Sequence, residues 1–380
     1  MKIALVLDDS IDRPDGVQQY VLTLAGYLTR AGHDVHVLCS TASPRPDVTV
    51  HSLARNVGVT FNGNGLRIPL PTSRRAIRAV LARERYDVIH VQTPHSPLFA
   101  ARVVDEARAL FGDAVRIVGT FHILPDGRVS SWGTHVLGRV LRRNLRRFDA
   151  FLAVSAPAAS FAASAFGISA RVVPCPVDVA GFAAAGSGAA EARSEAAVPG
   201  VDRPLVVAFL GRLVERKGVL ELVRALAELP DEVQDLIEVR LGGRGPLLGE
   251  VEAAVEANGL ERVALPGFVA EEDKAAFYAS ADIAVFPATG GESFGIVLVE
   301  AMASGAGVVL AGANPGYLSV IGSRPEVSVD ARDTEAFADA LERLVLDADL
   351  RAELHAAQAA GVLRFDVETV GAQVVEAYRG

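Results

Sequence analysis

The sequence predicts an α/β protein with two Rossmann-like, doubly wound domains that face a cleft. Apolar runs of strand length alternate with helical patterns, which is typical of parallel sheets. The alternation begins with residues 3–7, 16–30 and 35–38, and a second series begins near residue 204. A chain of 380 residues is also longer than one hydrophobic core usually supports, which favours two domains.

The two series set the expected domain boundaries. Further strands of the first series are expected near 88–91, 116–120, 151–154 and 172–174, and those of the second near 205–210, 238–241, 283–286 and 308–310. A segment rich in Ala, Gly, Ser and Glu separates them without periodicity and is interpreted as a linker. We expect a first domain at 1–182, a linker at 183–203, a second domain at 204–362 and a C-terminal helix at 363–380.

The composition is that of a globular chain. Half of the residues are apolar and 22% are charged. Cys39 and Cys175 are too few and too far apart for a disulfide framework or a metal knuckle. The initial apolar run is too short for a signal peptide, and no stretch reaches eighteen apolar residues. We therefore expect a cytoplasmic protein.

Charge is distributed unevenly along the chain. Residues 1–180 contain 21 Lys and Arg against 14 Asp and Glu, whereas residues 181–380 contain 16 against 32. A basic first half suggests an anionic partner such as a lipid head group or a membrane surface. Unselected surface variation is the alternative explanation.

The sharpest motif is the segment 290–300, which follows an expected strand and continues into an expected helix. Glu292 and Glu300 are eight positions apart. If all eight positions were helical, the two residues would lie about 12 Å apart along the helix. In a retaining glycosidase, by contrast, the two catalytic carboxylates lie only about 5–5.5 Å apart. The two carboxylates should therefore hold different parts of one long ligand. Ser293 is expected to cap the helix so that the amides of Phe294 and Gly295 receive a phosphate or a hydroxyl group.

A second motif, residues 211–218, forms another turn from an expected strand to an expected helix. It begins at Gly211 and carries Arg212 and Lys217. Fixed cations at this place can stabilise a leaving diphosphate as its charge develops. We find no clear metal-binding cluster and expect neither a metal nor a cofactor. The acidic triplet Asp347-Ala348-Asp349 is interpreted as structural.

Together these motifs resemble glycosyltransferase family 4, whose E-x7-E motif matches Glu292 and Glu300 and whose phosphate clamp matches Arg212 and Lys217. The chain is also similar to the bacterial phosphatidylinositol α-mannosyltransferases. That similarity is carried by the segments 290–303, 14–18 (Pro-Asp-Gly-Val-Gln), 61–63 (Phe-Asn-Gly) and 119–122 (Gly-Thr-Phe-His). It covers nearly the whole chain and implies a GT-B fold.

The resemblance implies roles for individual residues. Glu292 would hold the transferred sugar and Glu300 the ribose, Gly16 would approach the diphosphate, and His122 would lie beside the reacting centre. The first domain would bind the acceptor and the second the nucleotide sugar, with the C-terminal helix packed back on the first domain. The expected donor-binding residues are Gly16, Gly211, Arg212, Lys217, Glu292, Ser293, Phe294, Gly295, Ile296 and Glu300, of which Glu292, Arg212 and Lys217, together with His122, are the expected catalytic residues.

The implied reaction is a metal-independent, retaining transfer of a hexose, mannose from GDP-mannose, to a lipid-linked acceptor such as phosphatidylinositol in cell-envelope glycolipid synthesis. Three positions depart from the family pattern. Asp15 stands where the family usually has glycine, Pro174-Cys175-Pro176 replaces Pro-Asn-Gly, and Asp9 replaces an aromatic residue. These departures bear on donor binding, on the hinge and on the identity of the acceptor.

The acceptor side depends on histidines and on basic helical stretches. His122 closes an expected strand, at the edge where α/β proteins bind ligands, and His90 and His95 flank another strand end. The arginines of 74–85 and of 139–147 accompany apolar residues at helical spacing. Such helices lie on anionic bilayers or pack on a sheet. The expected acceptor or membrane residues are Asn62, Arg67, Arg74, Arg75 and Arg78.

Several alternatives remain open at this point. One is a glycosyltransferase that uses a UDP-sugar and a soluble acceptor, and another is a nucleotide-sugar binding protein without activity. A nucleotide-dependent oxidoreductase is disfavoured, because residues 8–13 replace the expected G-x-G-x-x-G after the first strand. We expect a nucleotide diphosphate sugar as the substrate and no nucleic acid as a partner. Docking on an anionic membrane would place the protein at the inner face of the cell membrane.

Overall fold

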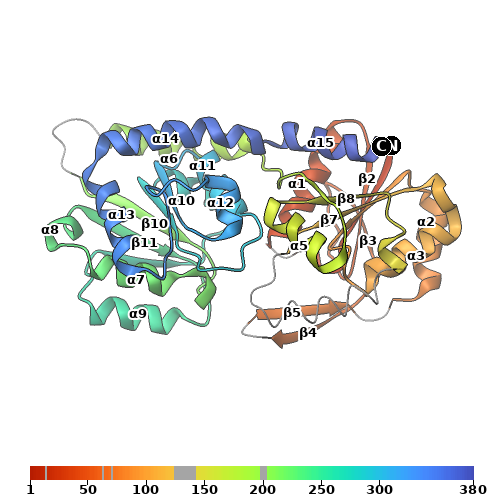
Figure 1. Cartoon of the computed structure of the whole chain (residues 1–380), viewed down its shortest axis with the longest axis horizontal. Helices are drawn as coiled ribbons and strands as arrows, with labels where there is room; N and C mark the ends of the chain where they lie inside the picture. Colours follow the sequence, from red (N-terminus) through yellow and green to blue (C-terminus); the bar gives the residue numbers. More distant parts are fainter. Residues whose placement is uncertain (13–14, 62–63, 70–71, 124–142, 197–202) are drawn as a thin grey trace. The chain divides into compact units, whose positions relative to one another are not determined.

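The computed structural model describes residues 1–12, 15–61, 64–69, 72–123, 143–196 and 203–380. The chain divides into two compact units (Figure 1). Unit 1 contains residues 1–176 and 367–380, and unit 2 contains residues 177–366. The chain passes between the units twice, at 176/177 and at 366/367. These two points are neighbours, because the Val177 amide donates to the Phe365 carbonyl oxygen at 3.0 Å and Val177 pairs with Asp366.

Unit 1 is built on a parallel sheet with the strand order β3-β2-β1-β6-β7-β8-β9. Its strands are β1 (Lys2–Val6), β2 (Asp34–Cys39), β3 (Thr49–Ser52), β6 (Val88–Gln92), β7 (Arg116–Phe121), β8 (Ala150–Ala153) and β9 (Arg171–Val172). Its described α-helices are α1 (Gly16–Arg30), α2 (Arg74–Glu84), α3 (Phe99–Phe111), α5 (Ala156–Phe166) and α15 (Val367–Arg379).

Continuous apolar runs fill the central strands of unit 1 because helices cover both faces of its sheet. The helices α2 and α3 enclose one apolar core with β1 and β6. The helix α1 packs against α15, which also contacts β7 (Figure 1). The strand order reverses between β1 and β6, and ligands of such sheets bind at the carboxyl ends of strands beside this reversal.

A two-stranded antiparallel hairpin in unit 1 was not expected from the sequence. It consists of β4 (Asn56–Phe61) and β5 (Asn64–Pro69). The sequence between them, Asn62-Gly63, is the strongest short hairpin signal known from turn geometry. Those two residues lie outside the described part of the chain.

Unit 2 is a second parallel sheet with the order β12-β11-β10-β13-β14-β15. Its strands are β10 (Leu205–Leu210), β11 (Ile237–Gly242), β12 (Val263–Gly267), β13 (Ile283–Phe286), β14 (Val308–Gly312) and β15 (Ser328–Val329). Its α-helices are α6 (Val179–Ala196), α7 (Val219–Ala227), α8 (Asp231–Gln234), α9 (Leu248–Ala257), α10 (Lys274–Ala279), α11 (Ile296–Ala303), α12 (Pro315–Ile321), α13 (Thr334–Leu346) and α14 (Ala348–Val362).

Two groups of helices cover the sheet of unit 2 (Figure 1). The helices α7, α9 and α13 share a large apolar core with the central strands. The helices α6, α10 and α11 pack against one another, and α11 and α14 contact each other and β14. The strand order reverses between β10 and β13, so this unit has a ligand-binding edge of the same type as unit 1.

The linker expected at 183–203 is wrong, because residues up to 196 belong to helix α6 of unit 2. The alanines that looked aperiodic are strong helix formers. Gly186 brings α6 so close to α11 that a Cβ there would collide with the carbonyl oxygen of Ser304. The boundary between the units accordingly lies at 176/177 and not at 182/183.

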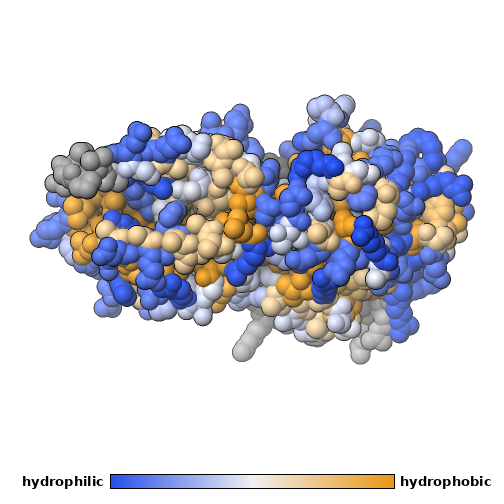
Figure 2. Space-filling view, turned by 90° about the horizontal axis from the view of Figure 1, so that it is seen from above, coloured by the Kyte–Doolittle hydropathy of each residue, from blue (hydrophilic) through white to orange (hydrophobic). Residues whose placement is uncertain are grey.

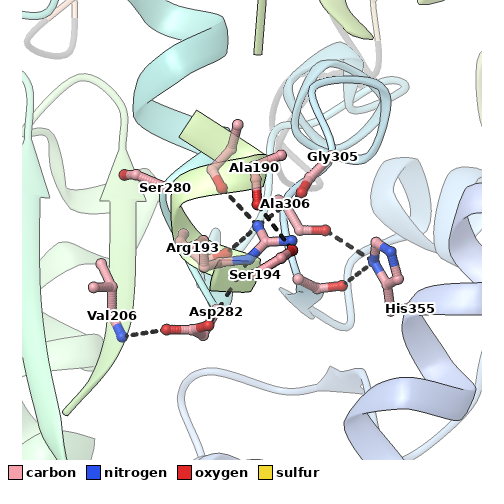
Figure 3. A network of polar contacts seen from close by, with 12 residues as sticks. Ala190, Arg193, Ser194, Val206, Ser280, Asp282, Gly305, Ala306 and His355 are labelled. Carbon is pink, nitrogen blue, oxygen red and sulfur yellow. Dashed lines mark hydrogen bonds and ion pairs between the residues drawn. The ribbon is translucent and has the colours of Figure 1, made fainter. Parts of the chain in front are cut away.

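A polar network fixes the end of α6 to unit 2 (Figure 3). Arg193 donates to the carbonyl oxygens of Ala279 and Gly305, at 2.6 and 2.7 Å, and so satisfies groups at the ends of α10 and α11. Arg203 binds both oxygens of Asp282, at 2.7 and 2.8 Å. The described residues of the expected linker, 183–196 and 203, therefore belong to the second unit.

The acidic triplet near the C-terminus has the structural role expected of it. Asp347 is the N-cap of α14, and its carboxylate accepts a hydrogen bond from the Leu350 amide at 2.8 Å.

Hydrophilic residues are interspersed with apolar ones on the face of each unit shown in Figure 2. Within the described residues, no helix is both long enough and apolar enough to cross a bilayer.

Candidate donor site and acceptor-side residues

The predicted charged motifs of unit 2 follow the two strands at which the strand order reverses. Residues 211–218 follow β10, and residues 287–295 follow β13. Since β10 and β13 are hydrogen-bonded neighbours, the two loops emerge side by side at the carboxyl edge. The Thr289 amide donates to the Arg216 carbonyl oxygen at 3.0 Å and ties one loop to the other.

Glycine permits this close packing of loops. Gly218 has φ +73°, and a Cβ there would collide with the carbonyl oxygen of Pro287. At Gly243, beyond β11, a Cβ would collide with the carbonyl oxygen of Gly211. Only glycine combines such backbone angles with so little space.

The loops bring Glu292 and Lys217 together. The Lys217 ammonium lies 2.8 Å from Glu292 Oε1, and both side chains are largely buried, with 15% and 13% of their surface exposed. The Arg216 guanidinium donates to the same oxygen at 2.6 Å. Two cations therefore converge on one carboxylate, which fixes its position and neutralises its charge.

Arg212 has a different environment. Its side chain is exposed, and among the described residues it forms no ion pair or hydrogen bond through its guanidinium. It lies two residues beyond the end of β10, at the start of the same loop as Lys217. An unpaired guanidinium at this edge is available to an anionic ligand.

Glu300 lies inside the unit, with 3% of its side-chain surface exposed. The Lys274 ammonium lies 3.3 Å from each of its two oxygens and 2.8 Å from Glu271 Oε1. Glu292 precedes α11, whereas Glu300 is the fifth residue of that helix. The two carboxylates thus have separate cation partners: Glu292 is paired with Arg216 and Lys217, and Glu300 is paired with Lys274.

The expectation that Ser293 caps the helix is wrong. Helix α11 begins at Ile296, and its N-cap is Gly295 with φ +115°, a conformation that favours glycine. A Cβ on Gly295 would lie 2.6 Å from the Tyr317 ring. The first helical amides therefore belong to Ile296 and Val297 and not to Phe294 and Gly295. The Phe294 side chain is buried and packs edge-on against Phe365, with ring centroids 5.5 Å apart.

In unit 1, His122 follows β7 and is 7% exposed. Its Nε2 lies 2.6 Å from Gln92 Oε1 and donates to it, which leaves Nδ1 as an acceptor. The ring meets Tyr20 edge-on at 4.7 Å. Burial, with the neighbouring His90 and His95, lowers the pKa of His122 to about 3. The imidazole is therefore neutral at physiological pH.

His90 is fully buried in a hydrogen-bonded network. Its Nδ1 lies 2.8 Å from the Tyr378 hydroxyl of α15, and its Nε2 lies 2.6 Å from Thr120 Oγ1. Burial lowers its pKa to about 3. His95 stacks on Phe121 at 5.6 Å, and burial lowers its pKa to about 4. His90 thus has a structural role, and it connects the C-terminal helix to the sheet of unit 1.

The backbone beside His122 is unusual. Thr93, directly after β6, has φ +55°, which is rare for a β-branched residue. Its amide donates to the Thr120 carbonyl oxygen at 3.0 Å. A Cβ at Gly119 would lie 2.9 Å from Pro94, so the Gly-Thr-Phe-His segment needs glycine where it passes the loop after β6.

The start of α1 carries the remaining expected donor residue. Gly16 is the first residue of α1 and is exposed, and Asp15 precedes it as the N-cap without a side-chain capping bond. Asp9, the other acidic departure, accepts hydrogen bonds from the Ser10 amide and from Asn56 Nδ2, each at 2.7 Å. Cys175, in the segment before the unit boundary, is buried.

The basic stretch at 74–85 forms helix α2, whose apolar stripe is buried in the core of unit 1. That stripe therefore cannot lie on a bilayer. Arg74, Arg75 and Arg78 are all exposed. Arg74 and Arg78 lie 2.9 and 3.3 Å from the two oxygens of buried Glu106, whereas Arg75 has no ion pair among the described residues. Asn62 and the side chain of Arg67 lie outside the described part of the chain, as do residues 139–142 of the second stretch.

Three polar residues were not predicted from the sequence. Arg216 could have been found as a neighbour of Lys217 in the same motif. Lys274 starts a helix far from Glu300 in the sequence, and only the packing of α10 against α11 brings it there. Gln92 ends β6, and its position beside β7 was the available signal.

Comparison with known proteins agrees with this geometry. The profile of Glycosyltransferase Family 4 matches residues 14–180, and that of Glycosyl transferases group 1 matches residues 193–360. The chain is 34% identical to a phosphatidyl-myo-inositol mannosyltransferase of Mycolicibacterium smegmatis, over 100% of this chain and 93% of the relative. It is 38% identical to a D-inositol 3-phosphate glycosyltransferase of Corynebacterium jeikeium, over 48% of this chain and 44% of the relative.

A solved structure supports the fold. The crystal structure of Anabaena HepE in complex with UDP and glucose has a TM-score of 0.74 at 20% identity, covering 100% of this chain and 99% of that chain. At that identity the likeness concerns architecture, and the sequence relatives supply the family. The chain belongs to glycosyltransferase family 4 and has the GT-B fold.

Proposed function

We propose that this glycosyltransferase transfers mannose from GDP-mannose to a lipid-linked acceptor of the phosphatidylinositol type, as a step in cell-envelope glycolipid synthesis. The observation that carries the proposal is the full-length similarity to a phosphatidyl-myo-inositol mannosyltransferase, at 34% identity. The ion-paired Glu292 and Lys217 support a donor site in unit 2.

The donor's diphosphate is proposed to bind near Arg212, Lys217 and the first amides of α11. Charge develops on the diphosphate as it leaves, and fixed donors in a partly buried site stabilise that charge. Arg212 is exposed and unpaired within the described part of the chain. Lys217 already lies at the site through its contact with Glu292. These groups take the role that a metal ion has in other transferases, so we expect a metal-independent reaction.

Glu292 is proposed to orient the sugar, and Glu300 the ribose. Arg216 and Lys217 hold Glu292 by the same oxygen, Oε1, so its other oxygen remains available to sugar hydroxyls. Glu300 lies on the helix that follows, beside Lys274. The reaction is proposed to proceed with retention and without a covalent enzyme intermediate, with a phosphate oxygen of the donor accepting the proton.

His122 of unit 1 is proposed to bind a sugar hydroxyl as a neutral imidazole. Its pKa of about 3 excludes it as a general acid near neutral pH, but a neutral ring still accepts a hydrogen bond at Nδ1. The bond to Gln92 holds the ring in one orientation. Gly16, exposed at the start of α1, leaves room for the diphosphate to approach the backbone.

Docking on an anionic membrane surface would bring the enzyme to its lipid acceptor, at the inner face of the cell membrane. The buried apolar stripe of α2 limits this docking to electrostatic attraction. Arg74, Arg75 and Arg78 are all exposed, but within the described residues Arg75 alone has no ion pair, since Arg74 and Arg78 are paired with Glu106. Attraction of this kind is screened by salt within about 8 Å at physiological ionic strength.

A second candidate function is transfer from a UDP-sugar to a soluble acceptor. The similarity to a D-inositol 3-phosphate glycosyltransferase over 48% of the chain favours it. A thermal-shift screen distinguishes the donors, because a ligand at 100 times its Kd stabilises the folded protein by about 2.7 kcal/mol. We expect GDP and GDP-mannose to raise the melting temperature more than UDP and its sugars do at equal concentration. The reverse order would favour the second candidate.

A further inference from the structure

A cluster of nitrogen and oxygen ligands in unit 1 has no part in the proposed reaction. It consists of His36 on β2, His51 on β3 and Glu84, the last residue of α2. His51 pairs with Leu38 in the sheet, so His51 and His36 are diagonal neighbours on one face. Their ligand atoms and a Glu84 oxygen all lie within 4.8 Å of one another.

The hydrogen bonds of His36 aim a lone pair at this cluster. His36 Nε2 lies 3.2 Å from Asp34 Oδ1, so its N–H donates to that carboxylate and Nδ1 is the unprotonated nitrogen. A histidine that ligates a metal commonly donates its other N–H to a carboxylate in this way.

The distances fit a small divalent ion. Nitrogen and oxygen ligands of tetrahedral zinc lie about 2.0–2.2 Å from the metal and hence roughly 3.4 Å from each other. His36 Nδ1 lies 3.0 Å from His51 Nε2 and 3.9 Å from Glu84 Oε2. The Tyr86 hydroxyl lies 2.8 Å from the same His36 nitrogen and donates to it, so a bound ion would replace this hydrogen bond. Adjustments of about half an ångström would bring these edges to the ideal value.

We propose that His36 Nδ1, His51 Nε2 and Glu84 Oε2 bind one divalent transition-metal ion, for which zinc is the best match. Two imidazoles and one carboxylate form a donor set that zinc prefers, and a water molecule would complete the tetrahedron. Lys2 and Arg83 each contact Glu84, at 2.7 Å, but a carboxylate offers about four lone-pair sites. The bound ion would fasten the edge strand β3 to the end of α2.

The test uses the untagged full-length protein, stripped of metal with a chelator and then dialysed. Cobalt(II) reports the site, because tetrahedral nitrogen and oxygen ligation gives intense visible bands without thiolate charge-transfer bands. We expect one equivalent of Co²⁺ to produce this spectrum, one equivalent of Zn²⁺ to abolish it, and Zn²⁺ to raise the melting temperature. None of these measurements depends on transferase activity.

Matched variants assign the site. His51→Gln, at a half-buried position, should abolish the cobalt spectrum and weaken zinc binding at least tenfold, and His36→Gln should do the same. His33→Gln is the control, because His33 is a histidine of the same unit that contacts the N-terminal amine and is not part of the cluster. His33→Gln should bind as the unchanged protein does. Absence of the tetrahedral spectrum, or equal binding by the unchanged protein and His51→Gln, would overturn the proposal.

Discussion

The candidate ligand-binding edges of the two units differ in the charge of their residues. After β10 and β13 of unit 2, the cations of Arg216 and Lys217 converge on the Glu292 carboxylate. At the carboxyl ends of β6 and β7 in unit 1, Gln92 and His122 form a neutral hydrogen-bonded pair. Unit 2 can therefore balance the charge that develops on a leaving group, whereas this part of unit 1 can orient a hydroxyl without exchanging a proton near neutral pH.

The largest expected effect is on turnover, and it tests the charged side of the comparison. Replacing Lys217 with Ala removes a fixed cation from the leaving diphosphate, and kcat should fall about 10²- to 10³-fold. Circular dichroism should show an unchanged fold. Arg224→Ala is the control, because Arg224 is an exposed cation of the following helix, paired with Glu221. Equal kcat values for the two variants would remove Lys217 from the mechanism.

Glu300 should act on donor binding more than on turnover. Glu300→Gln weakens the proposed contact with the ribose and its pairing with Lys274, so KM for the donor should rise roughly tenfold while kcat changes little. Glu271→Gln is the matched control, since Glu271 is a second carboxylate on the same Lys274 ammonium but is 55% exposed. Steady-state kinetics with varied donor concentration separates the two. A fall in kcat at constant KM would contradict the assignment to the ribose.

The neutral side of the comparison predicts acid sensitivity in unit 1. Burial lowers the pKa of His90 and His122 to about 3, below the unfolded value of about 6.5. The unfolded chain therefore binds more protons below about pH 6.5, and stability falls as the pH decreases from there toward about 3. Between pH 7.5 and 5.5, each of these histidines should cost about 1 kcal/mol of unfolding free energy.

Differential scanning calorimetry at the two pH values checks this effect. His355 is the one histidine of unit 2, and it is hydrogen-bonded to backbone carbonyls at its Nδ1. The melting temperature of unit 1 should therefore fall more on acidification than that of unit 2. The transition of unit 2 is identified by adding nucleotide, because a bound ligand raises its melting temperature. His122→Asn should flatten the pH dependence of the unit 1 transition. Equal shifts in both transitions would show that the buried histidines do not set it.

The smallest expected effect concerns membrane docking. Each exposed arginine near an anionic surface contributes about 1 kcal/mol. Replacing Arg74, Arg75 and Arg78 with Ser should weaken sedimentation with vesicles that contain anionic lipid, and Arg75→Ser alone should account for most of the loss, because the other two are paired with Glu106. Activity on a soluble acceptor head group should change little. Equal binding to neutral and anionic vesicles at low salt would end the membrane proposal.

The sequence was most informative where chemistry and backbone constraints coincide. The alternating apolar runs placed helix Gly16–Arg30 and most central strands, because buried parallel strands and amphipathic helices leave distinct periodicities. The segments around Glu292 and Lys217 carry chemistry that needs those residue types, so both stand out in the sequence alone. Their contact also follows from topology, since β10 and β13 are neighbours at the reversal of strand order.

The remaining features depend on contacts between distant segments. Helix α6 was missed because its alanine-rich sequence has almost no amphipathic pattern. The helix is held in place by Arg193, which donates to the carbonyl oxygens of Ala279 and Gly305. The capping role of Ser293 failed because Gly295, with its positive φ, starts the helix two residues later. The pairing of Arg74 and Arg78 with Glu106 was invisible because the partner lies on another helix.

The most direct test of the central claim is transfer of radiolabelled mannose from GDP-mannose to phosphatidylinositol in the presence of EDTA. We predict a labelled lipid product from the unchanged protein and roughly 10²-fold less from Lys217→Ala. Loss of activity in EDTA that Mg²⁺ restores would contradict the assignment of the diphosphate to Arg212 and Lys217. Efficient transfer from a UDP-sugar to a soluble acceptor, with none from GDP-mannose to the lipid, would contradict the proposed substrates.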